Sequence, residues 1–215
     1  MKKLNISFYP NTKDGFHCVQ ACLKSVLKFY FPRKDFSFKY LGKVTAHRRN
    51  KLTWDFSMLL FLLKKGFDII YVTKFNYKKF AKQGEKYLQS LWRDDVYQYQ
   101  KKYSDLKEER KFATSLAKSK RIKYYQRVAK LSDFRNLFKG EYLIMASINP
   151  FVLDGEDEYG SHLVLITNIT KNFIYFHDPG NPPYPNRKAS IKKFWKAASY
   201  PDNNSVDLIA VRYKK

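Results

Sequence analysis

Hydrophobic residues recur at helical spacing in the first third of the chain. The apolar positions from Val19 to Tyr30 are separated by steps of three and four, which predicts a helix over residues 18–31 that ends before Pro32. The same reading predicts a short strand over 4–9, a short helix over 35–45, an apolar helix over 54–65 and a strand over 67–72.

The middle of the chain is more polar. Residues 77–127 are rich in lysine, contain no proline and only one glycine, Gly84, and have helical propensity. We therefore expect a helical insertion of two or three helices at about 77–127.

The second half of the chain is rich in β-formers. After a short helix over 132–139, strands are predicted over 142–148, 162–169, 173–177 and 207–213, with a helix over 191–198 before the last strand. Helices come first and antiparallel strands follow, which is typical of an α+β domain whose helices pack against one sheet. A length of 215 residues favours a single domain spanning 1–215.

Composition excludes two classes of protein. Hydrophobic residues make up 44% and aromatic residues 18% of the chain, which is incompatible with general disorder. No apolar run approaches the roughly 18–20 residues that a membrane-spanning helix needs. The positively charged N-terminus lacks the apolar stretch of a signal peptide, so we expect a cytoplasmic protein without a transmembrane segment.

The net charge of +23 raises the alternative of a binding module. Lysine and arginine bind phosphates through counterion release, so the basic insertion is a candidate surface for nucleic acid or an acidic partner. A general lysine-rich composition explains the same charge without any such role. The most basic stretch, residues 101–130, contains no zinc-finger spacing, glycine-rich phosphate loop or aromatic RNA-binding signature.

Candidate chemistry begins at Cys18, which opens the first long helix after the turn at 11–15. The positive end of a helix and its unpaired N–H groups favour a thiolate, but a catalytic cysteine also needs a base. His17 adjoins Cys18 and would point away from it, and His47 lies in a basic loop. His162 is the better candidate because it follows Gly160 and Ser161 and opens an apolar strand.

The third candidate is Asp178. The turn at 168–172 predicts a hairpin between the strands at 162–169 and 173–178, which brings Asp178 back towards His162. The acidic loop around Gly155 is expected close to His162, as a mobile segment able to gate the cleft. Cys22 is expected to be a small buried hydrophobe and a free thiol like Cys18.

This ordered pattern resembles the papain-like cysteine peptidases of the bacteriocin-processing, double-glycine leader type. The resemblance rests on the segment from Cys18 to Leu23, on Gly160-Ser161-His162 before an apolar strand, and on an aromatic strand that ends in Asp178-Pro179. It implies a papain-like fold with Cys18 as nucleophile, His162 as general base and then acid, and Asp178 as the orienting group.

Two positions depart from the family pattern. Val19 stands where the family has glycine, and no glutamine precedes Cys18 at the family's oxyanion position. Asn11 is the upstream side-chain amide that could replace that glutamine, beside the backbone N–H of Cys18.

The sequence thus predicts a cysteine peptidase or amide hydrolase that works through a thioester, with an acyltransferase on the same site as an alternative. Its substrate would be a peptide or small amide, with Trp54, Gly160 and Ser161 as candidate substrate-binding residues. Trp54 could equally belong to the core. We expect no cofactor and no metal, since Cys18, Cys22 and His17 lack zinc-ligand spacing.

Overall fold

The structure is a computed structural model that describes residues 4–199 and 205–213. Residues 1–3, which include the two lysines of the localisation argument, lie outside these ranges. Within them the chain forms ten helices and one seven-stranded sheet.

The helices and strands alternate irregularly along the chain. The helices are α1 (Cys18–Tyr30), α2 (Phe38–Val44), α3 (Asp55–Lys64), α4 (Tyr77–Gln83), α5 (Glu85–Leu91), α6 (Asp94–Tyr103), α7 (Leu106–Ala117), α8 (Leu131–Lys139), α9 (Pro150–Asp154) and α10 (Ile191–Ser199). The strands are β1 (Phe67–Thr73), β2 (Ile122–Gln126), β3 (Leu143–Ile148), β4 (His162–Ile169), β5 (Phe173–Asp178), β6 (Tyr184–Ser190) and β7 (Leu208–Tyr213).

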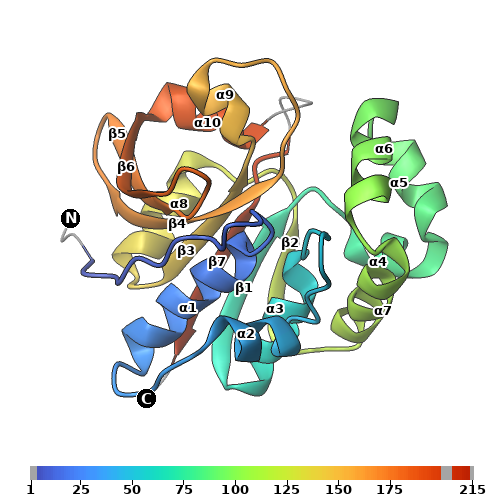
Figure 1. The fold of residues 1–215 in the computed structure, drawn as a ribbon, viewed down its shortest axis with the longest axis horizontal. Coiled ribbons are helices and arrows are strands. Elements are labelled where there is room, and N and C mark those ends of the chain that lie inside the picture. The colour runs from blue at the N-terminus through green and yellow to red at the C-terminus, as the bar shows by residue number, and fades with distance from the viewer. Residues whose placement is uncertain (1–3, 200–204, 214–215) are drawn as a thin grey trace.

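The sheet has the strand order β2-β1-β7-β3-β4-β5-β6. Strands β1 and β2 are parallel, and every other neighbouring pair is antiparallel. The late strands β3 to β6 form a meander at one side, while β7 returns to the middle and pairs with β1 from the first half of the chain (Figure 1).

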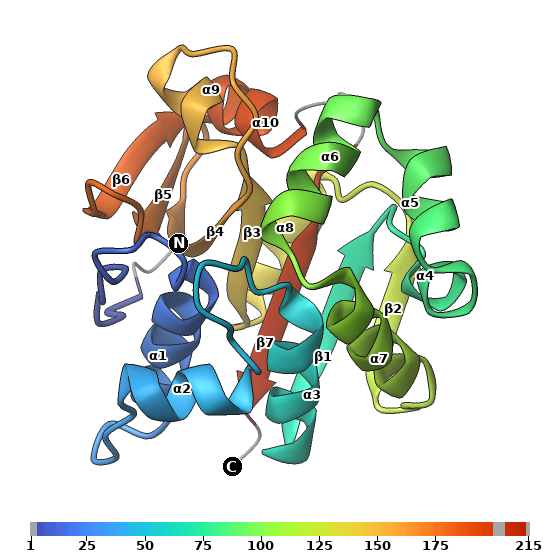
Figure 2. The same ribbon diagram turned by 45° about the vertical axis from the view of Figure 1, so that its right-hand side comes forward.

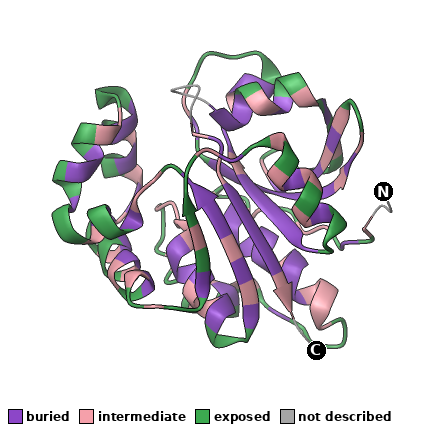
Figure 3. Ribbon diagram, turned by 180° about the vertical axis from the view of Figure 1, so that it is seen from behind, coloured by how far each residue is buried: buried purple, intermediate pink, exposed green. Residues whose placement is uncertain are grey.

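Alternate residues of the central strands belong to two hydrophobic clusters, one on each face of the sheet. In β4, Leu163 and Leu165 belong to the first cluster, and Val164 and Ile166 belong to the second. This period of two is the geometry of a strand buried on both faces. Figure 3 shows the resulting buried strands from behind.

Different helices cover the two faces. Residues of α1 to α7 enter the first cluster, and residues of α8, α9 and α10 enter the second. In Figure 2, α1, α2 and α3 lie in front of the sheet and α8 lies behind it. The helices α4 to α7 form a group beside the β1–β2 end of the sheet (Figure 1).

The α+β class expected from sequence is confirmed, but the expected antiparallel sheet is wrong in one detail: the sheet is mixed, because the edge strand β2 pairs in parallel with β1. The strand β2 was not predicted, since the segment 77–127 reads as polar and helical. Helices cover both faces of the sheet, because strands such as β3 and β7 are apolar on both faces and each face needs its own helical layer.

The insertion at 77–127 is only partly as expected. It holds four helices, α4 to α7, and then the edge strand β2. The strand β2 lacks a clear apolar pattern, so the sequence does not mark it as a strand. In β2 only Ile122 is buried, and Tyr124 packs on Tyr77 with ring centroids 4.5 Å apart. Two other elements were not predicted: the edge strand β6 and the short helix α9. The side chain of Asn149 caps α9 by accepting a hydrogen bond from Phe151 N.

The strand predicted over 4–9 does not form. Both edges of β4 already pair with β3 and β5, so this segment crosses the sheet with isolated bonds instead. Leu4 N donates to Thr167 O at 3.3 Å, and His177 Nε2 donates to Ile6 O at 2.8 Å.

Among residues 4–199 and 205–213, none of the helices combines the length and the hydrophobicity of a membrane-spanning segment.

Candidate active site

A closed turn places Cys18 at the first position of α1. Asn11 Oδ1 accepts from Thr12 N at 2.9 Å and from His17 N at 2.7 Å, and Asn11 Nδ2 donates to Gly15 O at 2.9 Å. Gly15 has a φ of 77°, a conformation that glycine adopts without strain. The turn fixes His17 as the N-cap, so the N–H groups of Cys18 and Val19 lie in the first turn, where they have no helical acceptor.

The hairpin predicted from sequence brings His162 and Asp178 together. His162 is the first residue of β4 and Asp178 the last residue of β5, and the two strands pair with Leu165 opposite His177. His162 Nε2 donates to Asp178 Oδ1 at 2.7 Å, and both side chains are buried. The other ring nitrogen, Nδ1, is then the one available to Cys18, to which His162 is hydrogen-bonded.

The environment favours a charged pair. Burial alone would raise the pKa of Cys18, but the hydrogen bond and charge of His162, with backbone bonds at Leu163 and Val19, lower it below its ordinary value. Burial would lower the pKa of His162, but hydrogen bonds to Asp178 and Cys18 and their charges raise it to about 10. Both shifts favour the thiolate of Cys18 and the imidazolium of His162 over the neutral forms of the two groups.

Asp178 is held by donors on both oxygens. Oδ1 also accepts from Gly180 N at 3.0 Å, and Oδ2 accepts from Arg187 Nη1 at 2.8 Å. Arg187 in β6 forms a second ion pair with Asp154 at the end of α9. Burial would raise the pKa of Asp178, but His162, Arg187 and Gly180 together lower it, so the group stays ionised.

The other cysteine and the nearby histidines have different surroundings. Cys22 is unbridged and buried, donates to Leu163 O at 3.3 Å, and has a pKa raised well above normal by burial and by the charges of Cys18 and Asp178. His17 Nδ1 contacts Thr12 Oγ1 at 2.6 Å, and His47 Nδ1 contacts Thr53 Oγ1 at 3.1 Å. Burial and nearby His17 lower the pKa of His47.

Cys18 and His162 line a cavity of about 200 Å³. Its walls combine aromatic side chains with polar and charged ones such as Asp55 and Lys74. They include all three of the residues that the sequence singled out for substrate binding, Trp54, Gly160 and Ser161. A Cβ on Gly160 would lie 2.8 Å from Phe151 Cε2, so the chain here requires glycine for close packing. The same loop leads directly into His162.

The helical insertion forms part of the cavity wall. Trp92, Val96 and Gln100, at the end of α5 and in α6, line it from one side. Gln100 Nε2 donates to Tyr159 Oη at 3.2 Å, and Tyr99 and Tyr159 have ring centroids 4.9 Å apart. These contacts connect α6 to the loop before His162, so the insertion and the nucleophile line the same cavity.

Trp54 connects this wall to the core. Its indole Nε1 donates to Gln100 Oε1 at 3.1 Å and to Ser104 Oγ at 2.9 Å, and its backbone N donates to Glu109 Oε1 at 3.0 Å. Burial raises the pKa of Glu109 to about 8 and that of the cavity residue Asp55 to about 6. Glu109 and Asp55 therefore take up a proton at a higher pH than ordinary carboxyl groups do.

Two expectations about the site need revision. Asn11 does not line the cavity: its carboxamide holds the turn before α1, so the structure gives it a structural place rather than one facing a bound carbonyl. Asp154 in the acidic loop is tied to Arg187, and Glu158 O accepts from Asn149 Nδ2 at 2.6 Å, which anchors a segment expected to be mobile.

Sequence reasoning missed Arg187 and Gly180. Arg187 lies in an exposed edge strand that no apolar pattern marks, and it lies opposite Phe176 in the β5–β6 register. A Cβ on Gly180 would lie 2.9 Å from Asp178 Oδ1 and 3.5 Å from His162 Nε2. In the sequence, the feature that could have indicated a role for Gly180 is its position two residues after Asp178, to which its backbone N–H donates.

No known protein-family model matches this chain, and no curated protein sequence matches it.

Proposed function

We propose that this protein is a papain-like cysteine hydrolase that cleaves a peptide or amide bond through a thioester. One observation carries the proposal: Cys18, His162 and Asp178 form a continuous hydrogen-bonded series at the wall of an apolar cavity. The lowered pKa of Cys18 and the raised pKa of His162 support it, because this is the protonation state that the reaction needs.

The acylation step follows from the positions of the three residues. The Cys18 thiolate attacks the carbonyl carbon, and the oxyanion that forms accepts from the backbone N–H of Cys18 in the first turn of α1. The imidazolium of His162 then gives its Nδ1 proton to the leaving amine. The C–N bond breaks, and the acyl group remains on Cys18 as a thioester.

Deacylation uses the same groups in reverse. His162, now neutral, accepts a proton from water as the water oxygen attacks the thioester; the C–S bond breaks, and the carboxylic acid, the Cys18 thiolate and the His162 imidazolium are formed. Asp178 keeps Nε2 of His162 protonated and the ring oriented throughout, as the third member of such a triad does. Arg187 and Gly180 N hold the Asp178 carboxylate for this task.

The cavity indicates which substrates fit. Trp54, Phe56, Phe75 and Trp92 give it an aromatic wall, and its volume exceeds the roughly 150 Å³ of an engineered cavity that binds benzene. We therefore expect an apolar or aromatic group beside the scissile carbonyl, inserted between α6 and the loop at 155–161.

The test is to trap the acyl-enzyme. The protein is incubated with a panel of peptide amides and p-nitrophenyl esters that carry alanine, leucine or phenylalanine at the acyl position, then quenched in acid and analysed by intact mass. We expect an adduct on Cys18, highest for leucine or phenylalanine, in wild type and in the matched control Cys22→Ala.

Cys18→Ala should form no adduct. Adducts that persist in Cys18→Ala, or that map to Cys22, would contradict the proposal. Absence of any adduct and of any product across the panel in the wild type would contradict it equally.

A further inference from the structure

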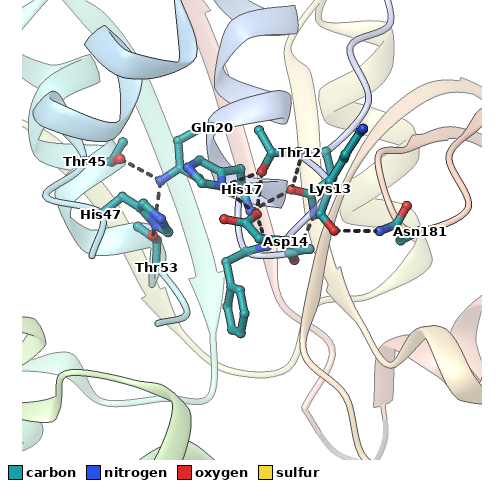
Figure 4. Close-up of polar contacts among 12 residues, drawn as sticks. Thr12, Lys13, Asp14, His17, Gln20, Thr45, His47, Thr53 and Asn181 are labelled. Carbon is teal, nitrogen blue, oxygen red and sulfur yellow. Dashed lines mark hydrogen bonds and ion pairs between the residues drawn. The ribbon is translucent and has the colours of Figure 1, made fainter. Parts of the chain in front are cut away.

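A second cluster of chemically able side chains lies beside the nucleophile but outside the triad. Asp14 and His17, from the turn before α1, face His47, from the loop after α2 (Figure 4). One ligand atom from each of the three lies within 4.8 Å of the other two. The sequence did not suggest this cluster because thirty residues separate His17 from His47.

The separations suit a transition-metal ion. Tetrahedral zinc with bonds of about 2.0–2.2 Å to nitrogen and oxygen holds its ligand atoms roughly 3.3 Å apart. The candidate ligand atoms of Asp14, His17 and His47 all lie within 4.8 Å of one another, and the two imidazole rings have centroids 3.9 Å apart. Asp14 is exposed, so its carboxylate can turn to close the remaining distance.

Hydrogen bonds orient both rings. Thr12 Oγ1 donates its single proton to Asp14 Oδ1 at 2.6 Å, so the contact of 2.6 Å with His17 requires His17 Nδ1 to donate to Thr12. Neutral His17 then carries its lone pair on Nε2. His47 Nδ1 lies 3.1 Å from Thr53 Oγ1, and in the tautomer in which Nδ1 donates to this oxygen, Nε2 of His47 carries the lone pair that can bind a metal ion. Such outer bonds are typical of histidine metal ligands.

The charge around the cluster is compatible with a cation. Arg48, the residue after His47, pairs with Asp105 at the start of α7 and with Glu108 at 3.7 Å. Two imidazoles and one carboxylate suit zinc and similar dications, whereas Mg²⁺ and Ca²⁺ prefer oxygen ligands alone.

We propose that Asp14, His17 and His47 bind one zinc-class dication, with a fourth position open to water. The ion joins the turn before α1 to the loop that follows α2. This proposal is independent of the proposed peptidase activity, because none of its ligands belongs to the triad.

The test is calorimetric titration with ZnCl₂ in a Cys18→Ser background, since Cys18 and His162 together can also hold zinc. We expect one Zn²⁺ per chain and a concentration-dependent rise in Tm that a chelator reverses. His47→Gln and Asp14→Asn should each weaken binding by more than the roughly 10- to 100-fold that the loss of an outer bond costs. Asp35→Asn, a matched exposed aspartate next to α1, should leave binding unchanged.

A second measurement separates the two possible zinc sites. Co²⁺ added to the wild type should give the visible bands of a nitrogen- and oxygen-bound ion that survive in Cys18→Ser. The proposal is overturned if Cys18→Ser abolishes metal binding, or if Asp14→Asn and His47→Gln bind Zn²⁺ as tightly as their parent.

Discussion

Replacing Cys18 by serine should make the free energy of unfolding depend on pH over a range where the wild type is insensitive to it. The folded pKa of His162 is raised to about 10. Its contribution is therefore complete below the unfolded value of about 6.5 and is lost as pH rises towards 10. Cys18 has a lowered folded pKa, so its contribution is complete above the unfolded value of about 8.5 and is lost as pH falls.

Between about pH 6.5 and 8.5 these two effects have opposite signs. The folded thiolate–imidazolium pair carries as many protons as the neutral thiol and imidazole of the unfolded chain, so the slopes cancel. Each full slope is about 1.4 kcal/mol per pH unit. Without the thiolate, only the slope of His162 remains, because Asp178 still raises its pKa. Because the unfolded histidine is still half protonated at pH 6.5, the slope is not full at first, and we expect Cys18→Ser to lose at most about 2 kcal/mol relative to wild type between pH 6.5 and 8.5.

The assay is urea unfolding under reducing conditions at pH 6.5, 7.5 and 8.5. The matched control is Cys22→Ser: the pKa of Cys22 is raised, so its thiol is neutral when folded and the wild-type slope should persist. Cys18→Ser/His162→Gln should abolish the new slope. Parallel pH profiles for Cys18→Ser and wild type would refute the charged pair.

Three other substitutions test the supports of the site. Arg187→Leu leaves Oδ2 of the Asp178 carboxylate without its charged donor, while His162 still holds Oδ1, and should cost about 1.5–3 kcal/mol in urea unfolding. Arg187→Lys should be intermediate, and an unchanged midpoint would show that the ion pair with Arg187 adds nothing. Gly180→Ala forces a Cβ against Asp178 Oδ1 and should cost about 1–3 kcal/mol and slow Cys18 alkylation, whereas Gly42→Ala, with its nearest contact at 3.8 Å, should be neutral or slightly stabilising. Gln100→Ala removes the bond to Tyr159 and opens the cavity, so kcat/KM for bulky over small apolar substrates should rise by about 10-fold or more; an unchanged ratio would place the insertion outside the substrate path.

The parts of the site that could be predicted from sequence are those that local rules determine. A turn followed by a helical apolar pattern places Cys18 at a helix start, and a short turn between two β-rich segments places Asp178 beside His162. Both relations depend on residues close in sequence, and the structure brings all three side chains together as expected.

The parts that could not be predicted depend on edge strands and long-range contacts. Arg187 reaches Asp178 from β6, an exposed strand without an apolar pattern, and Gln100 reaches Tyr159 from an insertion that reads only as polar and helical. His47 meets His17 across two different loops. In each case the fold brings together segments that are far apart in sequence, and the local sequence pattern does not indicate such a contact. For Asn11 the sequence position alone was misleading. Its amide lies at a suitable distance before Cys18 in the sequence, but in the structure it forms hydrogen bonds that hold the turn before α1.

The measurement that tests the central claim most directly is the pH dependence of iodoacetamide alkylation, followed separately at Cys18 and Cys22 by mass spectrometry. The account predicts that Cys18 reacts with an inflection well below the value of about 8.5 of an ordinary thiol, and that His162→Ala moves this inflection upwards. Cys22 should stay unmodified in the folded protein at neutral pH. A Cys18 inflection at the ordinary value, or one that His162→Ala does not move, would contradict the thiolate–imidazolium pair and the activity proposed from it.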